Sequence, residues 1–524
     1  MLDTNKIYMG LSFDGEKQYG DRVEMLLAQA NRHGLIAGAS GTGKTVTMKV
    51  MAEAFSDAGV PVFLCDVKGD VSGIAEPGAD NDGMQARIDR FGIRDTFAFK
   101  SYPVTFWDIY GRGGHPVRTT VSDMGPDILA RILNLTEVQE GVLRIIFKIA
   151  DDHALKILDM KDLRAVIAYV SEHRTEYVVR YGNMATQSIG AISRALLTLE
   201  DEGAEQFFGE PALELTDWIR QSPDGRGMIN ILHAVEAIRY PKLYASFLLW
   251  MLAELYEALP EVGDVEKPVM AFFFDEAHFL FSDAPKALIE KIEQVVRLIR
   301  SKGVGVYFVT QSPSDIPDTI LAQCSNRIQH ALRAYTPAEQ KAVRAAARAF
   351  RVNPDFDAEE ALMALGTGEA LVSFLDETGA PQIVSRTAII CPQSLMAPCA
   401  ESTRAALIGN SPFLYKYKDA VDNESAYEVL EQNAAKKAEE DELARQKAEL
   451  EAEKAAFERE KQKQAEAAEK AAAKEKEKAE KAAQKEKEKK EKAAERRRNK
   501  IETQLISTGG QLFRRGLFSI LKIR

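Results

Sequence analysis

The sequence predicts an α/β fold built around a parallel β-sheet with helices on both faces. Short, continuously apolar runs such as Val62–Cys65 and Phe272–Phe274 are typical of strands that are buried on both faces of a sheet. Apolar residues at helical spacing between Thr45 and Ala58 indicate a helix that precedes the first of these strands. Hydrophobic residues make up 45% of the chain, which is enough to build the core of such a domain.

The first predicted strand, residues 33–37, leads into the segment GASGTGKT, Gly38 to Thr45. Apolar residues at helical spacing follow as far as Ala58, and Gly59 and Pro61 then end the helix. The segment fits the pattern G-x-x-x-x-G-K-[ST], in which backbone N–H groups surround the phosphates of a nucleotide. Because strand, loop and helix occur in the required order, we predict a phosphate-binding loop rather than a chance match.

The residues of this loop have separate expected roles. We expect Lys44 to reach the β- and γ-phosphates and the hydroxyl of Thr45 to ligate Mg²⁺. The predicted nucleotide-binding residues are Gly38, Ala39, Ser40, Gly41, Thr42, Gly43, Lys44 and Thr45. ATP and Mg²⁺ are therefore the predicted cofactors.

Two carboxylates follow the apolar run Phe272–Phe274. We expect Asp275 to hold Mg²⁺, directly or through water, and Glu276 to orient and polarise the attacking water. Adjacent residues of a strand point to opposite sides, so the two roles are geometrically compatible. The alternative is an acidic pair that merely ends a strand, and the phosphate-binding loop favours the catalytic interpretation.

A polar amide, Gln311, ends the apolar run that begins at Val304. It is placed to sense the γ-phosphate and the attacking water, although a plain turn residue before Ser312 would fit equally well. Arg300 and Arg327 are candidates for a guanidinium supplied across a subunit boundary, which assists phosphoryl transfer. For Arg300 the alternative is a favourable place at the negative end of a helix.

Other polar residues near the predicted strand ends have less certain roles. Asp66 ends the strand that begins at Val62, at the edge of a sheet where ligands bind, and we expect a functional role that stays unassigned. Lys68 and Arg112 are weak candidates for contacts with nucleic-acid phosphates in a pore. His278 completes the string DEAH and receives no catalytic role.

A helical insertion interrupts the α/β pattern, and a charged tail follows it. From about residue 123 to 218 amphipathic helical segments prevail and strand signals are few. The predicted division is 1–122 and 226–395 for the two parts of the core, 123–225 for the helical insertion, 396–433 for a connector, 434–500 for a charged helix and 501–524 for a basic amphipathic tail.

The tail is rich in Ala, Glu, Lys and Gln and has no Pro or Gly over residues 434–500. Leu443, Leu450 and Phe457 are seven residues apart, but no second apolar heptad position accompanies them, so a solvated spacer helix is favoured over a coiled coil. The last segment, 501–524, combines apolar and basic residues. It is either a helix for a membrane surface or a partner, or a packing element that folds back.

Charge and cysteine content limit the class of protein. The formal charge is −11, and residues 431–524 hold 26 Lys and Arg against 20 Asp and Glu, so the rest of the chain is strongly acidic. That balance argues against a broad nucleic-acid-binding face, although a ring can confine basic residues to a narrow pore. Four scattered cysteines predict reduced thiols in a cytoplasmic protein without a zinc site. The N-terminus has no apolar run typical of a signal peptide.

Taken together, the single phosphate loop, the strand FFFDE and the strand ending VTQ resemble the HerA/FtsK superfamily of P-loop motor ATPases. The segments NRHGLIAGASGTGKT, RSKGVGVYFVTQSP and LGTGEALVS carry the resemblance, which covers about residues 5–395. Longer stretches are most similar to a bacterial group of HerA-like helicase C-terminal domains. The resemblance implies a RecA-like P-loop NTPase fold of the ASCE type.

The resemblance also implies a homo-hexameric ring that hydrolyses ATP and moves along double-stranded DNA. It assigns Arg300 as the arginine that acts on the neighbouring subunit's nucleotide. HerA proteins carry a β-barrel before the loop, and only 37 residues precede Gly38 here, so a nuclease partner is not implied. A second hypothesis is an ATP-switched scaffold that recruits partners or a membrane surface through its tail.

The string DEAH also suggests the two-lobed DEAH helicases. Those proteins have two tandem RecA-like lobes and a motif Q-x-x-G-R-x-G-R. This chain has neither, so we reject that interpretation.

Overall fold

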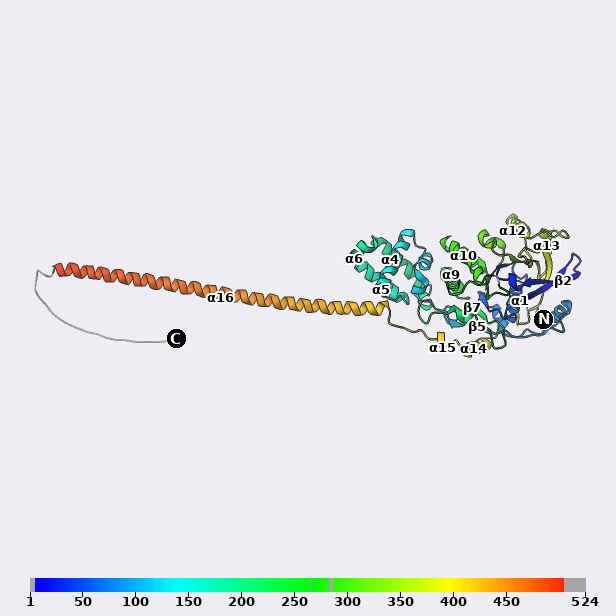
Figure 1. Cartoon of the computed structure of the whole chain (residues 1–524), viewed down its shortest axis with the longest axis horizontal. Helices are drawn as coiled ribbons and strands as arrows, with labels where there is room; N and C mark the ends of the chain where they lie inside the picture. Colours follow the sequence, from blue (N-terminus) through cyan, green and yellow to red (C-terminus); the bar gives the residue numbers. More distant parts are fainter. Residues whose placement is uncertain (1–4, 264, 282–285, 504–524) are drawn as a thin grey trace. The chain divides into compact units, whose positions relative to one another are not determined.

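The computed structural model describes residues 5–263, 265–281 and 286–503. The chain divides into two compact units, Met1–Gln432 and Asn433–Arg524. The first holds the sheet with its covering helices, and the second consists of most of the long helix α16 (Figure 1).

The sheet of the first unit has twelve strands in the order β2-β1-β12-β11-β10-β3-β9-β8-β4-β7-β5-β6. Their bounds are β1 Lys6–Phe13, β2 Tyr19–Leu26, β3 Gly34–Ala37, β4 Val62–Asp66, β5 Val104–Asp108, β6 His115–Pro116, β7 Ile229–His233, β8 Met270–Phe274, β9 Val304–Thr310, β10 Asn326–His330, β11 Glu369–Ser373 and β12 Ser385–Ile389. From β10 to β6 every pair is parallel, and from β2 to β10 every pair is antiparallel. The predicted parallel sheet is therefore confirmed, and an antiparallel extension continues it on one side.

The parallel strands are buried on both faces, as their apolar runs predict. Alternate residues enter different cores: Phe63 and Cys65 pack on one side of the sheet, Val62 and Leu64 on the other. This alternation follows from the two-residue period of a strand. The central part of the unit thus has three layers, with the sheet in the middle.

Helices cover both faces and also form the insertion between β6 and β7. Their bounds are α1 Lys44–Asp57, α2 Asp82–Arg90, α3 Val121–Ile132, α4 Glu137–Asp152, α5 Met160–Glu172, α6 Arg174–Tyr181, α7 Thr186–Asp201, α8 Ala204–Phe207, α9 Pro241–Ala258, α10 Lys286–Ile299, α11 Asp318–Leu321, α12 Pro337–Arg348, α13 Ala358–Ala364, α14 Glu401–Gly409, α15 Leu414–Tyr417 and α16 Ala426–Thr503. The inserted helices α3–α8 lie in the predicted helical region, while the residue bounds proposed for the domains stay a prediction.

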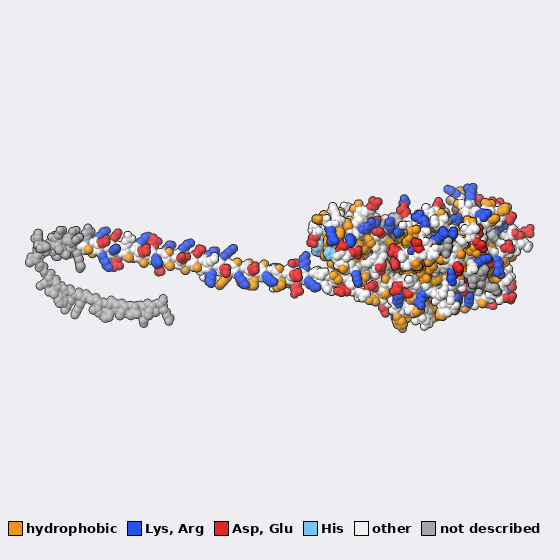
Figure 2. Space-filling view, in the orientation of Figure 1, with side chains coloured by type: hydrophobic (Ala, Val, Ile, Leu, Met, Phe, Trp, Pro, Cys, Tyr) orange, Lys and Arg blue, Asp and Glu red, His pale blue; other side chains and the backbone are white. Residues whose placement is uncertain are grey.

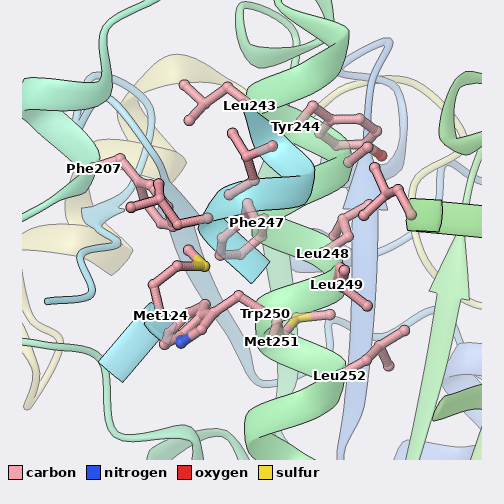
Figure 3. Packing of buried hydrophobic residues seen from close by; sticks show 14 of the residues in the cluster. Met124, Phe207, Leu243, Tyr244, Phe247, Leu248, Leu249, Trp250, Met251 and Leu252 are labelled. Atoms are coloured by element: carbon pink, nitrogen blue, oxygen red, sulfur yellow. The ribbon is translucent and has the colours of Figure 1, made fainter. Parts of the chain in front are cut away.

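The insertion is anchored to the core through α9. Figure 3 shows Met124 of α3 and Phe207 of α8 beside Phe247 and Trp250 of α9. The ring of Phe207 meets that of Phe247 edge to face, with centroids 5.8 Å apart, and the ring of Trp250 at 6.1 Å. Aromatic pairs of this geometry add to the free energy of burial, so α9 joins the insertion to the sheet.

The segment 393–396, which follows the last strand of the sheet, is hydrogen-bonded to α1. The ammonium of Lys49 donates to the carbonyl oxygens of Leu395 (2.9 Å) and Met396 (3.1 Å). One helical turn on, Glu53 accepts from the backbone N–H groups of Gln393 (2.8 Å) and Ser394 (3.0 Å). Both charged side chains are almost fully buried, and the 393–396 segment supplies their hydrogen bonds.

The charged tail forms one helix, α16, on which acidic and basic side chains are interspersed (Figure 2). Leu443, Leu450 and Phe457 are exposed by 51%, 52% and 70%, so this unit itself buries none of the three. The spacer helix favoured from the sequence and the alternative of a coiled coil through these residues both stay predictions. The predicted tail 501–524 lies outside the described residues from 504 onward. In the part of the chain that is described, no helix combines the length and the hydropathy needed to cross a membrane.

We predict that Phe207→Ala lowers the free energy of unfolding by about 3–4 kcal/mol, because it leaves a cavity between α8 and α9. Val179→Ala is the matched control on the same insertion, since Val179 is 95% exposed and its truncation removes little buried surface. Chemical denaturation of the full chain measures both. Equal losses in the two variants would contradict the anchoring role of Phe207.

Candidate functional site

The predicted phosphate-binding loop connects β3 to α1. Gly41 and Gly43 have φ of +75° and +115°, which a residue with a side chain rarely adopts. A Cβ on Gly38 would lie 2.5 Å from Cβ of His330. These glycines let the backbone pass close to β10 and turn into the first residue of α1, where the N–H groups of a helix start are available to phosphate oxygens.

Lys44 closes this loop. Its ammonium donates to the carbonyl oxygens of Gly38 (2.7 Å) and Ala39 (3.2 Å). Burial lowers the pKa of Lys44, and the charge of Glu276 acts in the opposite direction. Lys44 and Glu276, which are far apart in the sequence, therefore lie close enough to influence each other.

His330 on β10 supports the loop and the helix behind it. Its Nε2 is 2.9 Å from Oγ1 of Thr47, and its Nδ1 is 3.0 Å from the carbonyl oxygen of Glu369. Burial lowers the pKa of His330 to about 4, so the ring is neutral at physiological pH. Sequence reasoning assigned this residue no role, because its place beside Gly38 depends on the pairing of β10 with β3.

Asp275 and Glu276 follow β8 as predicted. Asp275 is 2% exposed, and its Oδ1 accepts from the N–H of Glu276 (2.9 Å). Burial, together with the charge of Glu276, raises the pKa of Asp275 to about 7. Among the described residues its Oδ2 has no hydrogen-bond partner.

An unpartnered, buried carboxylate oxygen fits a hard divalent cation, and so does the hydroxyl of Thr45 in the first turn of α1. The described part of the chain holds no cluster of three or more His, Cys, Asp and Glu side chains placed to bind a metal. Mg²⁺ at this position would therefore take its remaining ligands from phosphate oxygens and water, as it usually does in nucleotide sites.

Glu276 is the most heavily contacted carboxylate of the site. Lys68, which follows β4, donates to its Oε1 in an ion pair. Its Oε2 accepts from Nε2 of Gln311 (3.3 Å) and lies 3.2 Å from Nδ1 of His278. Burial opposes ionisation of Glu276, but the hydrogen bond and charge of Lys68 outweigh it, and the pKa of Glu276 is lowered. The carboxylate is therefore ionised.

Gln311 stands on a loop that a single carboxylate stabilises. Oδ2 of Asp315 accepts from Oγ1 of Thr310 (2.8 Å) and from the N–H of Ser312 (2.9 Å). These two residues flank Gln311 in the sequence, so Asp315 fixes the backbone from which the amide reaches Glu276. The segment Ser312–Asp315 shows the sequence signature of a helix cap, which could have identified Asp315.

A cavity of about 790 Å³ adjoins these groups. Ala39 and Ser40 of the phosphate loop line it, together with His278, Gln311 and residues of α12. The volume lies within the range of small-molecule binding sites.

The sequence pattern of the family described as "Helicase HerA-like C-terminal" matches residues 12–522. The chain belongs to this family. No protein of curated function matches the sequence. The resemblance stated from the motifs is therefore confirmed at the level of the family.

Solved structures similar to this HerA-like chain include the plasmid coupling protein TrwB. Its complex with ADP and Mg²⁺ is 14% identical, with a TM-score of 0.50 over 74% of this chain and 95% of that chain. Its complex with the ATP analogue ADPNP is 14% identical, with a TM-score of 0.50 over 75% and 96%. VirB4 of Thermoanaerobacter pseudethanolicus is 13% identical, with a TM-score of 0.44 over 76% and 97%. The predicted RecA-like P-loop fold is confirmed, and the HerA-like chain is a P-loop ATPase by family and fold.

In this HerA-like ATPase, Arg300 lies at the opposite edge of the sheet from the phosphate loop. Ser301, Lys302 and Gly303 separate it from the start of β9, whereas Gln311 immediately follows the end of β9. Seven strand residues separate the two ends, roughly 23 Å at the usual rise per residue. The charge of Arg300 acts on His33, which precedes β3 at that same edge. Arg300 therefore does not reach the nucleotide loop of its own protomer.

Arg327 has a structural role in the same HerA-like core. Its guanidinium donates to the carbonyl oxygens of Cys324 (3.1 Å) and Leu321 (3.0 Å), at the end of α11. Burial lowers the pKa of Arg327, and these bonds satisfy the buried donors. Asp66 stabilises the loop that follows it. Its Oδ1 accepts from the N–H of Gly69 (2.7 Å), and this hydrogen bond shapes the loop that carries Lys68.

We predict that acidification weakens the fold through His33, whose Nδ1 accepts from the N–H of Val306 (3.0 Å). Burial lowers the pKa of His33 from 6.5 to about 4. Between pH 4 and pH 6.5 the unfolded chain binds more protons than the folded chain. The contribution of His33 to the free energy of unfolding is therefore fully present above about pH 6.5 and is lost as the pH falls towards 4. Asn tolerates the φ of +53° at this position and does not titrate. His33→Asn should therefore remove up to about 3 kcal/mol of the acid-induced loss in the free energy of unfolding.

Denaturation of the full chain at several pH values measures this contribution. The other buried histidines are the same in wild type and in His33→Asn. The contribution of His33 is therefore the difference between the two slopes of the free energy of unfolding against pH. Parallel slopes between pH 6.5 and 4 would contradict the role assigned to His33.

Proposed function

We propose that this HerA-like ATPase is a ring-forming motor that hydrolyses ATP to move along double-stranded DNA. The single observation that carries the proposal is the placement of the Glu276 carboxylate beside the phosphate loop, in an ion pair with Lys68 and a hydrogen bond from Gln311, which follow neighbouring strands. An anionic base that is fixed in place suits the activation of water for attack on a γ-phosphate. Membership of the HerA-like family supports the motor function.

In this proposal the residues of the loop, Gly38–Thr45, bind the triphosphate, and Lys44 contacts its terminal phosphates. Thr45 and Asp275 would hold Mg²⁺, and the ion would supply positive charge to the phosphates. Glu276 accepts a proton from the attacking water, and Gln311 orients the same water. The TrwB structure solved with ADP and Mg²⁺ supports the choice of nucleotide and ion, since TrwB shares the fold. We place the protein in the cytoplasm, where its four free cysteines stay reduced.

The position of Arg300 supports the proposed ring. Because the residue lies at the edge of the sheet remote from its own loop, it serves catalysis only when a neighbouring protomer presents it. We therefore propose a homo-hexamer in which Arg300 completes the site of the adjacent subunit and stabilises charge in the transition state.

An ATP-switched scaffold is the second candidate, and α16 favours it. A 78-residue helix on which Leu443, Leu450 and Phe457 are exposed is suited to spacing or recruiting other molecules. In this scheme the segment 501–524 would contact a partner or a membrane surface, and hydrolysis would not respond to DNA.

We predict that Glu276→Gln lowers the ATP turnover number at least about 100-fold, because the amide accepts no proton. Steady-state hydrolysis with and without double-stranded DNA measures this. Stimulation of the wild type by DNA, absent in the variant, is expected of the motor. Glu377→Gln on an exposed loop is the control and should behave as wild type. Hydrolysis that DNA leaves unchanged would favour the scaffold, and hydrolysis that survives in Glu276→Gln would contradict the catalytic assignment.

We also predict that Arg300→Ala lowers turnover by roughly a factor of 1,000 and that this loss is repaired in trans. Mixing Arg300→Ala with Glu276→Gln forms boundaries where an intact Glu276 meets an intact Arg300, so activity should reappear above that of either variant alone. Arg297→Ala, one turn earlier on α10 and also exposed, should keep full activity. A mixture as inactive as its components would exclude the proposed action across the boundary.

A further inference from the structure

Lys68 stands on a loop whose shape is fixed independently of its side chain. The loop follows β4, which pairs in parallel with β8, so its residues lie beside those that follow β8. Gly69 has φ of +83°, its N–H donates to Asp66 (2.7 Å), and its carbonyl accepts from Oγ of Ser72 (3.0 Å). The ammonium of Lys68 is thereby directed at Glu276 across 208 residues of sequence.

The two members of this ion pair differ sharply in accessibility. The side chain of Lys68 is 48% exposed, whereas that of Glu276 is 3% exposed. An incoming anion can therefore approach the ammonium, while the carboxylate is sheltered. Since Gln311 and His278 lie on the other carboxylate oxygen, Lys68 masks the oxygen that they leave open.

We propose that Lys68 is a latch that occupies Glu276 until a phosphate oxyanion takes its ammonium. This inference rests on the role proposed for Glu276 as the residue that activates water. A phosphate and a carboxylate compete for the same charge-assisted hydrogen bonds. Once the phosphate holds Lys68, Oε1 of Glu276 can accept a hydrogen bond from water, so hydrolysis is coupled to the arrival of the anion.

Two sources can supply the phosphate. The γ-phosphate of ATP is one, because the strands that precede Lys68, Glu276 and the phosphate loop are parallel members of one sheet and end on the same side of it. The backbone of a nucleic acid is the other, because the exposed ammonium is open to a polyanion. The chemistry is the same in both cases, and ligand choice separates them.

The test is a double-variant cycle that measures binding to the full-length protein. Glu276→Gln replaces the carboxylate by a neutral amide and releases Lys68, so it should tighten the binding of a phosphate ligand roughly fivefold. The ligands are ADPNP, ADP and a double-stranded DNA. A gain for ADPNP but not for ADP identifies the γ-phosphate as the source, and a gain for DNA identifies the backbone.

The combination Lys68→Ala/Glu276→Gln decides whether the gain depends on Lys68. Removing the charge of Glu276 also relieves its direct repulsion of a phosphate, and that effect persists without the lysine. The latch predicts that the gain over Lys68→Ala alone is clearly smaller than the gain over wild type, and that Lys68→Arg/Glu276→Gln restores the full gain. No gain for any ligand, or a gain of equal size without Lys68, overturns the proposal.

Lys6→Ala serves as the control, because it removes another exposed lysine from an ion pair, with Glu24 at the edge of the sheet (3.4 Å). It should leave every affinity unchanged. The cycle measures binding alone, so its outcome does not depend on turnover. If the wild type fails to hydrolyse ATP, the proposed function fails, whereas the competition for Lys68 is judged separately by the cycle.

Discussion

The site depends on one constraint, the parallel alignment of β3, β9, β8 and β4. Strands that run in the same direction end at the same edge of a sheet, and there they bring together residues from distant parts of the chain. The phosphate loop follows β3, Gln311 follows β9, Asp275 and Glu276 follow β8, and Lys68 comes after β4. Few of these side chains meet through local sequence. The register of the strands sets their positions. The hydrophobic core that buries the strands therefore also sets the distances between the residues of the site.

The parts of the fold that the sequence predicts are those with strong local signals. The loop between β3 and α1, the uninterrupted apolar strands and the Pro-free and Gly-free helix α16 all have patterns that only one type of element satisfies. The antiparallel strands β1, β2 and β12 are different. Their residues are partly exposed, and the pairing of β1 with β12 joins the start of the core to residues near 389. Long-range pairing of this kind leaves no local periodicity to recognise.

The residues of the site also fall into those with a local sequence signal and those without one. Lys44, Thr45, Asp275 and Glu276 belong to contiguous motifs and were predictable, and Gln311 was predictable as a strand-end amide. The residues that hold these side chains in place were not predictable. The contact of His330 with Thr47 and that of Lys68 with Glu276 each depend on which strands become neighbours. Lys68 shows the difference most clearly: the pore contact suggested by a lysine in a polar loop stays a prediction, and its ion pair with Glu276 depends on the pairing of β4 with β8.

The 393–396 segment behind α1 has a consequence for where this ATPase can be cut. Its carbonyl and N–H groups are the hydrogen-bond partners of the buried charges of Lys49 and Glu53, on the helix that begins with Lys44. A fragment that stops at the last strand would leave an ammonium and a carboxylate in an apolar interior without those partners. The smallest autonomous ATPase therefore includes the 393–396 segment, which lies beyond the last strand, β12.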